Sequence, residues 1–399
     1  MALSSNIIGA FSALDGTAIT VRQDRCAKVR NRNVSCLKCA EACTSGCISL
    51  VDGRLTIDAD SCVGCGTCAT ACPTCALEAR NPSDAQLLNE CLNARENDQV
   101  TIACKLLLEA SEGLIDVRKM AMVVCSGRVE ESLICGLVTH GVKNIVIACG
   151  TCDCCAQKHG QAMSLTVAES ARALLAAWGS DACVSVTNEL PAYVLAEGVD
   201  KYRASCDIEA FFCKTRTNEP LKKTEKLLQK AGEDVIEKPT PEAELPPSKL
   251  FHVMKDGTLP HFVPDRRSRL LEYLSALGEP QVDSIATRLW GSVVIDGRKC
   301  TSCRMCATFC PTGAIRKFDD LAGLFGVDHF PGDCVKCGSC RDICSEDAIV
   351  ILDETKPNYL IDGAKHHYLM KPRPAAINSP HQIVNAMRQN LKESNIFER

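Results

Sequence analysis

Long apolar runs are missing from this sequence of 399 residues. No stretch approaches the roughly 20 consecutive apolar residues that a membrane-spanning helix needs, and the best runs are short, strand-like pieces such as Asn144–Cys149. The first residues carry no basic segment, no twin-arginine pair and no small-residue cleavage site, so they do not have the pattern of a signal peptide. We therefore expect a cytoplasmic protein with no membrane span.

A surplus of positive charge is also missing. The 45 lysines and arginines are balanced by 49 acidic residues, which gives a net charge of −4 at pH 7. Because a nucleic-acid binder usually shows a basic stripe, we expect protein partners and no nucleic acid. The chain has no glycine-rich phosphate loop after a strand, no nucleophile elbow and no zincin helix. We therefore expect neither a nucleotide or flavin site nor a catalytic residue of these kinds.

Cysteine, in contrast, is abundant, with 29 residues. A chain of this length can form two to four domains with ordinary hydrophobic cores, so it does not need cross-links for stability. A reducing cytoplasm disfavours disulfides and favours metal binding by the same thiols. The spacing of the cysteines decides between these two uses.

Most cysteines fall into two blocks, one near each end of the chain. In three runs, three cysteines separated by two residues each are followed by a fourth after three more, and two of these runs end in proline. This is the ligand spacing of bacterial two-cluster 4Fe-4S proteins. The runs begin at Cys62, Cys300 and Cys334. A fourth block, Cys36, Cys39, Cys43 and Cys47, has one extra residue between its second and third cysteines.

Zinc also uses cysteine pairs separated by two residues. A zinc ribbon needs two such pairs, whereas these blocks hold three closely spaced cysteines followed by a fourth. The spacing therefore favours iron-sulfur clusters over zinc.

These motifs resemble the bacterial two-cluster ferredoxin family over residues 18–80 and 290–355, including an Asp52-Gly53 turn between two short strands. In that family, the fourth cysteine of each block binds the neighbouring cluster. The resemblance implies a first cluster on Cys36, Cys39, Cys43 and Cys72, and a second on Cys62, Cys65, Cys68 and Cys47. It implies a third cluster on Cys300, Cys303, Cys306 and Cys344, and a fourth on Cys334, Cys337, Cys340 and Cys310.

The segment between the blocks alternates short apolar strands with amphipathic helices, which indicates an α/β domain. Its part from Val123 to Cys155 resembles the delta subunit of methyl-viologen-reducing hydrogenase, through Cys125-Ser-Gly-Arg, Cys149 and Asp153-Cys154. That family carries a 2Fe-2S cluster between a flavin-bearing partner and a hydrogenase. The resemblance implies such a cluster on Cys104, Cys125, Cys149 and Cys154. The family has a cysteine pair where this sequence has only Cys104, so the alternative is a set of buried or free thiols.

Seven further cysteines have no ligand-like spacing, and we expect most of them to fill apolar space. They are Cys26, Cys75, Cys91, Cys135, Cys183, Cys206 and Cys213.

The expected architecture is two α+β ferredoxin-like cluster modules that flank an α/β insert. The expected boundaries are residues 1–98 for the N-terminal module, 99–213 for the insert, 214–250 for a charged, proline-rich linker, and 251–355 for a helical lead-in and the C-terminal module. Residues 356–399 are expected to form an extended docking tail, since Ile383, Met387 and Leu391 make an apolar stripe at helical spacing near its end.

The function that fits these features is an iron-sulfur subunit that relays electrons through four 4Fe-4S clusters, with a 2Fe-2S cluster as a fifth station. The partners expected in such a hetero-oligomer are a molybdenum, tungsten or flavin enzyme, or a hydrogenase. One alternative is a thiol or unusual-cluster reductase centred on Cys149–Cys155, and another is a redox sensor or cluster scaffold. Thiol-reducing activity would identify the first, and slow cluster transfer the second.

Overall fold

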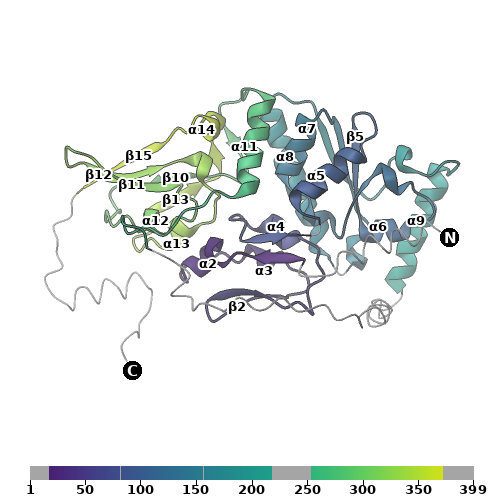
Figure 1. The fold of residues 1–399 in the computed structure, drawn as a ribbon, viewed down its shortest axis with the longest axis horizontal. Coiled ribbons are helices and arrows are strands. Elements are labelled where there is room, and N and C mark those ends of the chain that lie inside the picture. Colours follow the sequence, from purple (N-terminus) through teal and green to yellow (C-terminus); the bar gives the residue numbers. More distant parts are fainter. Residues whose placement is uncertain (1–17, 81, 156, 218–252, 372–399) are drawn as a thin grey trace.

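The computed structural model describes residues 18–80, 82–155, 157–217 and 253–371. We call residues 18–80 the N-terminal module, 82–217 the insert and 253–371 the C-terminal module. Figure 1 shows the N-terminal module in purple beneath the other two, with the insert in blue and teal on one side and the C-terminal module in green and yellow on the other. The fold is thus mixed, with a parallel sheet in the middle part of the chain.

The N-terminal module consists of two small antiparallel strand pairs connected by one-turn helices. Strand β1 (Ile19–Val21) pairs with β4 (Leu77–Ala79), and β2 (Ile48–Val51) pairs with β3 (Arg54–Ile57). Asp52 and Gly53 both have positive φ, as a tight hairpin turn between twisted strands requires. The helices are η1 (Gln23–Arg25), α2 (Ala27–Arg30), α3 (Lys38–Glu41) and α4 (Thr67–Ala71).

The insert contains a four-stranded parallel sheet in the order β6-β5-β7-β8. Its strands are β5 (Gln99–Cys104), β6 (Ala121–Val123), β7 (Asn144–Ala148) and β8 (Cys183–Thr187). Its helices are α5 (Asp84–Asn93), α6 (Lys105–Ala110), η2 (Val117–Lys119), η3 (Ser126–Arg128), α7 (Glu131–Thr139), η4 (Cys152–Cys154), α8 (His159–Ala177), η5 (Ala192–Val194) and α9 (Lys201–Thr217). The strands are apolar along most of their length because helices cover both faces of such a sheet.

The C-terminal module repeats the small strand pairs and adds a third strand to one of them. Strand β10 pairs with β13, and β9 pairs with β14, while β11, β12 and β15 form one antiparallel sheet. The strands are β9 (Ile285–Ala286), β10 (Ser292–Ile295), β11 (Ile315–Asp319), β12 (Phe325–His329), β13 (Ile349–Leu352), β14 (Glu354–Thr355) and β15 (His366–Met370). The helices are α11 (Asp265–Leu277), α12 (Met305–Thr308), η7 (Pro331–Asp333), α13 (Ser339–Asp342) and α14 (Pro357–Ile361).

Helix α11 joins the C-terminal module to the insert. It begins after Pro264 and is followed by Gly278, whose φ is 108°. Its Leu270 and Leu274 are buried in the core that surrounds the parallel sheet, and Trp290 of the C-terminal module lies in the same core. The insert and the C-terminal module therefore share one hydrophobic core instead of being separate bodies.

Three expected boundaries differ in the structure. Helix α5 packs into the core of the insert through Leu87 and Cys91, so the N-terminal module ends near β4 instead of at residue 98. Helix α9 continues to Thr217, past the expected end of the insert. The linker from residue 218 onward lies outside the described residues.

The expected tail is the largest of these differences, because residues 356–371 are folded. Strand β15 pairs with β12 along its whole length, and Tyr368 Oη donates a hydrogen bond to the Val293 carbonyl at 2.6 Å. Asp328 of β12 contacts both Lys365 Nζ and His367 Nδ1 at 2.6 Å. The sequence prediction was wrong here because the alternating residues of this short strand are half polar on an exposed sheet, so they give no apolar pattern. The expected terminal helix lies outside the described residues.

Among the described residues, none of the helices combines the length and apolarity that crossing a bilayer requires.

Candidate iron-sulfur sites

The C-terminal module brings together both of its predicted cysteine sets. The third set lines one cavity, together with the side chains of Ile295 and Met370, and consists of Cys300, Cys303, Cys306 and Cys344. The fourth set is buried more deeply, and burial followed by the charges of its other thiols raises the pKa of Cys340 well above its ordinary value. The fourth set consists of Cys310, Cys334, Cys337 and Cys340.

The N-terminal module brings together the second set, but with one additional thiol. A single cavity is lined by Cys43, Cys47, Cys62, Cys65 and Cys68. The sulfur atoms of Cys43 and Cys47 are 3.5 Å apart. The predicted set included Cys47 and assigned Cys43 to the first cluster.

The first set also contains a thiol that its prediction lacked. Burial raises the pKa of Cys39 to about 12, with further contributions from the charges of Cys72, Cys26 and Cys36. The charges of Cys72 and Cys36 also help to raise the pKa of the buried Cys26 thiol. The first site is therefore surrounded by Cys26, Cys36, Cys39 and Cys72.

A repeated pattern of main-chain hydrogen bonds identifies the position of each cysteine within its block. The first thiol accepts from the amide two residues ahead, as at Cys300 and Cys334, and Cys26 does the same with Lys28. A one-turn helix precedes both Cys26 and Cys334, and the amide of each donates to the carbonyl three residues before it. Cys26 is thus the structural counterpart of Cys334.

The fourth thiol of each block is identified by the strand that follows it. Cys72 and Cys344 each accept a hydrogen bond from the amide four residues ahead, at 3.3 Å, and a strand begins at the next residue. Cys43 accepts from the amide of Cys47, and β2 begins at Ile48. Cys43 is therefore the fourth cysteine of its block, and Cys47 occupies the place of an alanine in the other blocks.

This geometry differs from the predicted first and second sets: Cys26 lies where the first set had Cys43, and Cys43 has the position in its block that the second set gave to Cys47. The sequence contained the signal for the second difference, because an aliphatic residue stands five positions after every fourth cysteine: Ile48, Leu77, Ile315 and Ile349. It hid Cys26, since residues 27–35 separate this cysteine from Cys36 where the other blocks have only two residues.

Left-handed backbone positions shape three of the four binding loops. The second and fourth residues after the first cysteine have positive φ in each of these loops: Gly64 and Gly66, Ser302 and Arg304, and Lys336 and Gly338. Such alternation turns successive amide groups toward a common centre, which is a frequent arrangement around anionic iron-sulfur clusters.

The donor sets fit 4Fe-4S clusters in a second respect. Iron binds the thiolate, and burial with mutual repulsion raises the pKa of Cys39 and Cys306 to about 12. Bound iron would offset that repulsion between neighbouring thiolates. In the part of the chain that the structure describes, no three candidate ligands lie close enough to hold a single metal ion; in a cubane, each thiolate binds a separate iron.

The insert gathers further thiols at the carboxyl edge of its parallel sheet. Cys104 ends β5 and Cys149 follows β7, and these two strands are neighbours at the point where the connections leave in opposite directions. Ligands collect at such a switch point in open α/β sheets. The Gly150 amide donates to Cys104 Sγ at 3.3 Å. Cys125 follows β6 at the same edge, while Cys154 lies in η4 with a side chain outside the described part.

Two other thiols join this group in the insert. A hydrogen bond with Cys149 lowers the pKa of Cys152 to about 7, and burial raises that of Cys155 to about 11. The charge of Cys65, in the second site, contributes to the raised pKa of both Cys155 and Cys125. The thiols of the insert therefore adjoin the second site.

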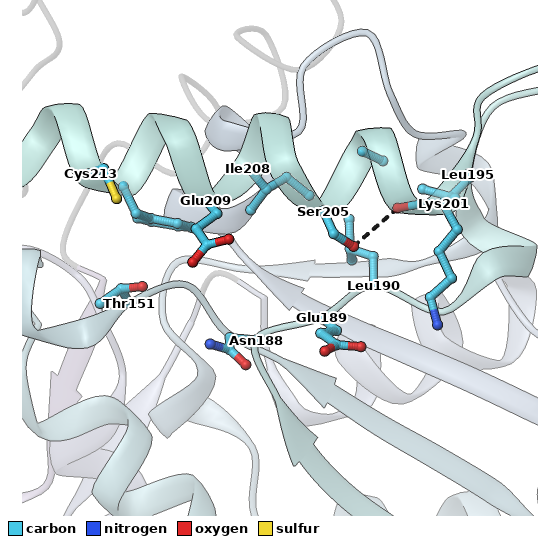
Figure 2. A pocket seen from close by; sticks show the side chains of 12 residues that line it. Thr151, Asn188, Glu189, Leu190, Leu195, Lys201, Ser205, Ile208, Glu209 and Cys213 are labelled. Carbon is cyan, nitrogen blue, oxygen red and sulfur yellow. Dashed lines mark hydrogen bonds between the residues drawn. The ribbon is translucent and has the colours of Figure 1, made fainter.

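A cleft of about 420 Å³ opens beside this group, between α9 and the loop after β8. Figure 2 shows Ser205 and Glu209 of α9 facing Asn188 and Glu189, with Thr151 at one end. Thr151 directly precedes Cys152, so the cleft leads toward the thiols of the insert.

The two modules touch at the first and fourth sites. Asp342 Oδ2 accepts hydrogen bonds from the Ser35 amide and hydroxyl, at 2.7 and 2.5 Å. Arg30 Nη2 donates to the Pro260 carbonyl at 2.8 Å. The charge of Cys36 contributes to the raised pKa of the Cys337 thiol in the fourth site.

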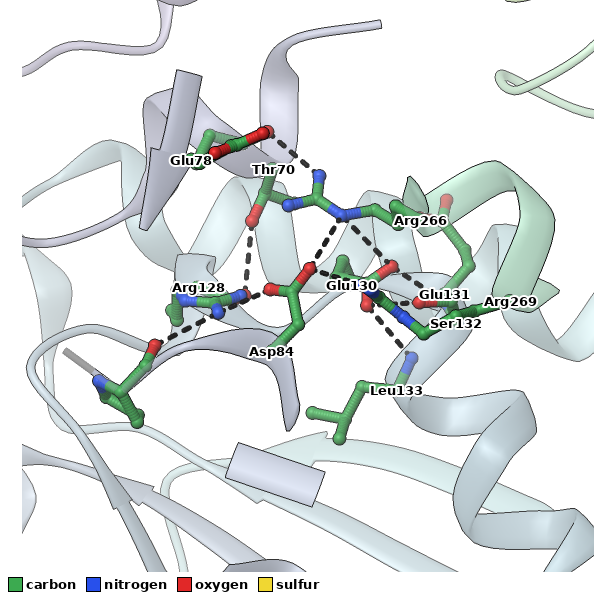
Figure 3. Close-up of polar contacts among 12 residues, drawn as sticks. Thr70, Glu78, Asp84, Arg128, Glu130, Glu131, Ser132, Leu133, Arg266 and Arg269 are labelled. Carbon is green, nitrogen blue, oxygen red and sulfur yellow. Dashed lines mark hydrogen bonds and ion pairs between the residues drawn. The ribbon is translucent and has the colours of Figure 1, made fainter. Parts of the chain in front are cut away.

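A buried charge network joins the N-terminal module, the insert and α11. In Figure 3, Asp84 lies between Arg128, 2.5 Å from its Oδ1, and Arg266, 3.7 Å from its Oδ2. Arg269 also contacts Oδ2. Although burial opposes ionisation, these arginines hold the pKa of Asp84 well below its usual range. Arg266 also donates to the Ala69 carbonyl at 2.9 Å, which ties α11 to the helix that carries Cys68. The network fixes the cluster-binding loops relative to the insert.

Two family models match the chain, a 4Fe-4S dicluster domain over residues 298–349 and a 4Fe-4S binding domain over residues 53–74. An uncharacterized ferredoxin of Methanocaldococcus jannaschii is 32% identical over 108 residues, which cover 24% of this chain and 69% of that protein. The chain belongs to the 4Fe-4S ferredoxins.

Two further relatives of this ferredoxin are subunits of oxidoreductases. NADH-quinone oxidoreductase subunit I of Pelobacter propionicus is 40% identical over 73 residues, which cover 16% of this chain and 39% of that protein. Pyruvate synthase subunit PorD of M. jannaschii is 36% identical over 63 residues, covering 16% and 69%. Neither family-model match reaches the insert, and no solved structure matches the chain.

The two 4Fe-4S domains and these relatives give iron-sulfur electron transfer as the activity of this ferredoxin.

Proposed function

We propose that this ferredoxin passes single electrons along a row of four 4Fe-4S clusters between redox partners in an oxidoreductase complex. The first cluster is held by Cys26, Cys36, Cys39 and Cys72, and the second by Cys43, Cys62, Cys65 and Cys68. The third is held by Cys300, Cys303, Cys306 and Cys344, and the fourth by Cys310, Cys334, Cys337 and Cys340.

The observation that carries this proposal is the direct contact between the first and fourth sites, through Ser35 with Asp342 and Arg30 with Pro260. Within each module, the crossed fourth cysteines, Cys72 and Cys310 among them, connect the two sites. The resulting order is second, first, fourth, third. An electron then moves only between adjacent clusters, and no covalent bond is made or broken.

We also propose that the insert carries a further iron-sulfur station, a 2Fe-2S cluster, next to the second site. Cys104, Cys125 and Cys149 lie at the carboxyl edge of the sheet, where a ligand would be expected. Cys154, Cys152 and Cys155 are the candidates for the fourth ligand. This station would extend the row to the surface of the insert.

The proposed partners are a molybdenum, tungsten or flavin enzyme, or a hydrogenase, in a hetero-oligomer. The likeness to subunits of two oxidoreductases supports a place in such an assembly. Copurification of this ferredoxin with a substrate-reducing subunit tests this point.

Metal analysis tests the function. Anaerobically purified protein should contain about sixteen iron and sixteen sulfide per chain with the four cubanes loaded, and about two more of each with the station in the insert. Stoichiometric zinc with little iron would contradict the proposal.

A second candidate is a thiol or unusual-cluster reductase in the insert, favoured by the cleft lined by Thr151, the residue before Cys152. In that case, the isolated, reduced protein would reduce a disulfide, and the variant Cys152→Ser would not. Under the relay proposal, neither protein reduces a disulfide, and both accept electrons into their cubanes.

A further inference from the structure

Arg30 carries a buried positive charge from the N-terminal module to the fourth site. It is only 6% exposed, and its guanidinium donates to the carbonyls of Asp24 and Pro260, at 3.0 and 2.8 Å. The residue after Pro260 contacts the fourth site directly, since His261 Nδ1 lies 3.0 Å from the Cys310 carbonyl oxygen. Burial lowers the pKa of Arg30, while the charges of Cys310, Asp24 and Cys337 oppose that effect.

Arg267 brings a second buried positive charge from the opposite side. It is 7% exposed, and its guanidinium lies 4.2 Å from the centre of the Trp290 ring and donates to the Leu289 carbonyl at 2.5 Å. The amide of Gly291, next to that tryptophan, donates to Cys334 Sγ. Arg267 Nη1 is buried and has no hydrogen-bond partner among the described residues.

The carboxylates nearest Arg267 are already paired with other arginines. Glu131 forms two contacts of 2.6 Å with Arg288, and Asp333 lies 2.6 Å from Arg316. Among the charged groups around Arg267, the Cys334 thiolate has the largest effect on the pKa of this arginine.

Arginines near the other sites are neutralised or exposed to solvent. Arg128 packs against Gly66 in the second site, but it is paired with Asp84. Arg304 in the third site is paired with Asp319 at 2.8 Å. Arg266 near the first site contacts both Asp84 and Glu130.

Accepting the proposed function, we infer that Arg30 and Arg267 make the fourth cluster the most oxidising of the four, so that electrons collect at the junction between the two modules. Each one-electron reduction adds a negative charge to the cluster. A buried cation stabilises this reduced state more than the oxidised state, because the surrounding protein screens the charge poorly. The two residues thus tune the relay without binding iron.

A redox titration followed by electron paramagnetic resonance tests this inference on the full chain. The signal of the fourth cluster is identified by its loss in Cys340→Ser. The fourth cluster should have the most positive midpoint of the four cubanes. Arg267→Gln and Arg30→Gln should each lower its reduction equilibrium constant at least tenfold, which corresponds to about 59 mV for a one-electron couple.

Charge-conserving and exposed variants serve as controls. Arg267→Lys keeps the charge and should recover most of the shift, which a purely packing role would not allow. Arg298→Gln, near the third site with a side chain 95% exposed, should change no midpoint. If Arg267→Gln loses the fourth cluster, the midpoint in Arg30→Gln decides.

Two results can be distinguished if the inference is wrong. Four cubanes with the fourth not the most positive, or with its midpoint unchanged in Arg30→Gln and Arg267→Gln, would overturn the tuning role and leave the relay in place. Fewer than four cubanes in the wild-type protein would overturn the proposed function itself.

Discussion

The two modules share one pattern of cysteines and hydrogen bonds, but each departs from it in a different place. In the N-terminal module, residues 27–35 enlarge the first binding loop, and this enlarged loop supplies both Arg30 and Ser35 to the junction. In the C-terminal module the binding loops stay compact, and the addition is β15, a third strand beside β12. One departure thus joins the modules to each other and the other adds an edge strand, while three of the four binding loops keep the same backbone geometry.

The first loop also lacks the left-handed positions that the other three loops share. Leu37, which corresponds to Gly66 and Gly338, has a φ of −134°. The amides of this loop are therefore presented differently to its cluster. A longer loop with ordinary backbone angles can still place its thiols, because Cys26 is positioned by its own one-turn helix.

Cysteine substitutions should have the largest effect and test the enlarged loop directly. Cys26→Ser and Cys43→Ser should each remove one cubane, about four of sixteen irons, since each removes a proposed ligand. Cys47→Ala should retain all four, because alanine occupies that place in the other three blocks. Iron analysis and electron paramagnetic resonance measure the result. Loss of a cubane in Cys47→Ala, with none lost in Cys26→Ser, would restore the assignment expected from spacing.

Truncation should have the next largest effect and tests the added strand. Ending the chain after Thr355 removes β15, with the Tyr368 hydrogen bond and both partners of Asp328, so we expect a loss of at least about 3 kcal/mol in the C-terminal module. Ending it after Lys371 should change stability by less than about 0.5 kcal/mol. Denaturant unfolding followed by cluster absorbance gives both values; equal values would show that β15 does not support the module.

The shorter truncation also tests the docking role expected for the end of the chain. Removing residues 372–399 should leave four clusters and abolish copurification with the catalytic partner. Full recovery of the partner would refute that role.

The smallest expected effect concerns the contact between the modules. Asp342→Ala removes two hydrogen bonds from Ser35 and an exposed contact with the neighbouring Arg341. We expect a loss of about 1 kcal/mol, or roughly 2 to 4 °C in melting temperature. Asp319→Ala, which removes an exposed partner of Arg304 within the C-terminal module, is the matched control and should change less. An equal or larger loss in the control would mean that the Ser35–Asp342 contact does not hold the modules together.

Cysteine spacing could predict both C-terminal sets because two-residue gaps leave the chain only one way to surround a cluster. It gives no signal for Cys26, where residues 27–35 break the usual gap, and it does not separate Cys43 from Cys47, which lies four residues further along the chain. The hydrogen-bond pattern, the start of β2 and the aliphatic Ile48 five positions later distinguish Cys43 from Cys47. Local spacing therefore predicts cluster loops only where the loop has its usual length.

The contacts between residues that are distant in the chain could not be predicted from the sequence for a different reason. Helix α11 has a clear start at Pro264 and end at Gly278, yet nothing in it indicates that Tyr273 packs against Gly136 of α7. The same is true of Ser35 and Asp342, which are distant in the chain and have no pattern that pairs them. Such contacts depend on three-dimensional packing and not on periodicity.

The most direct test of the account is the magnetic coupling between clusters in the fully reduced protein. Electron paramagnetic resonance of the wild-type protein should show the fourth cluster coupled both to the third, in its own module, and to the first, across the junction. In Cys26→Ser, which lacks the first cluster, the fourth should keep only its coupling to the third. An identical signal of the fourth cluster in the wild-type protein and in a variant shown to lack the first cluster would contradict a continuous row through both modules.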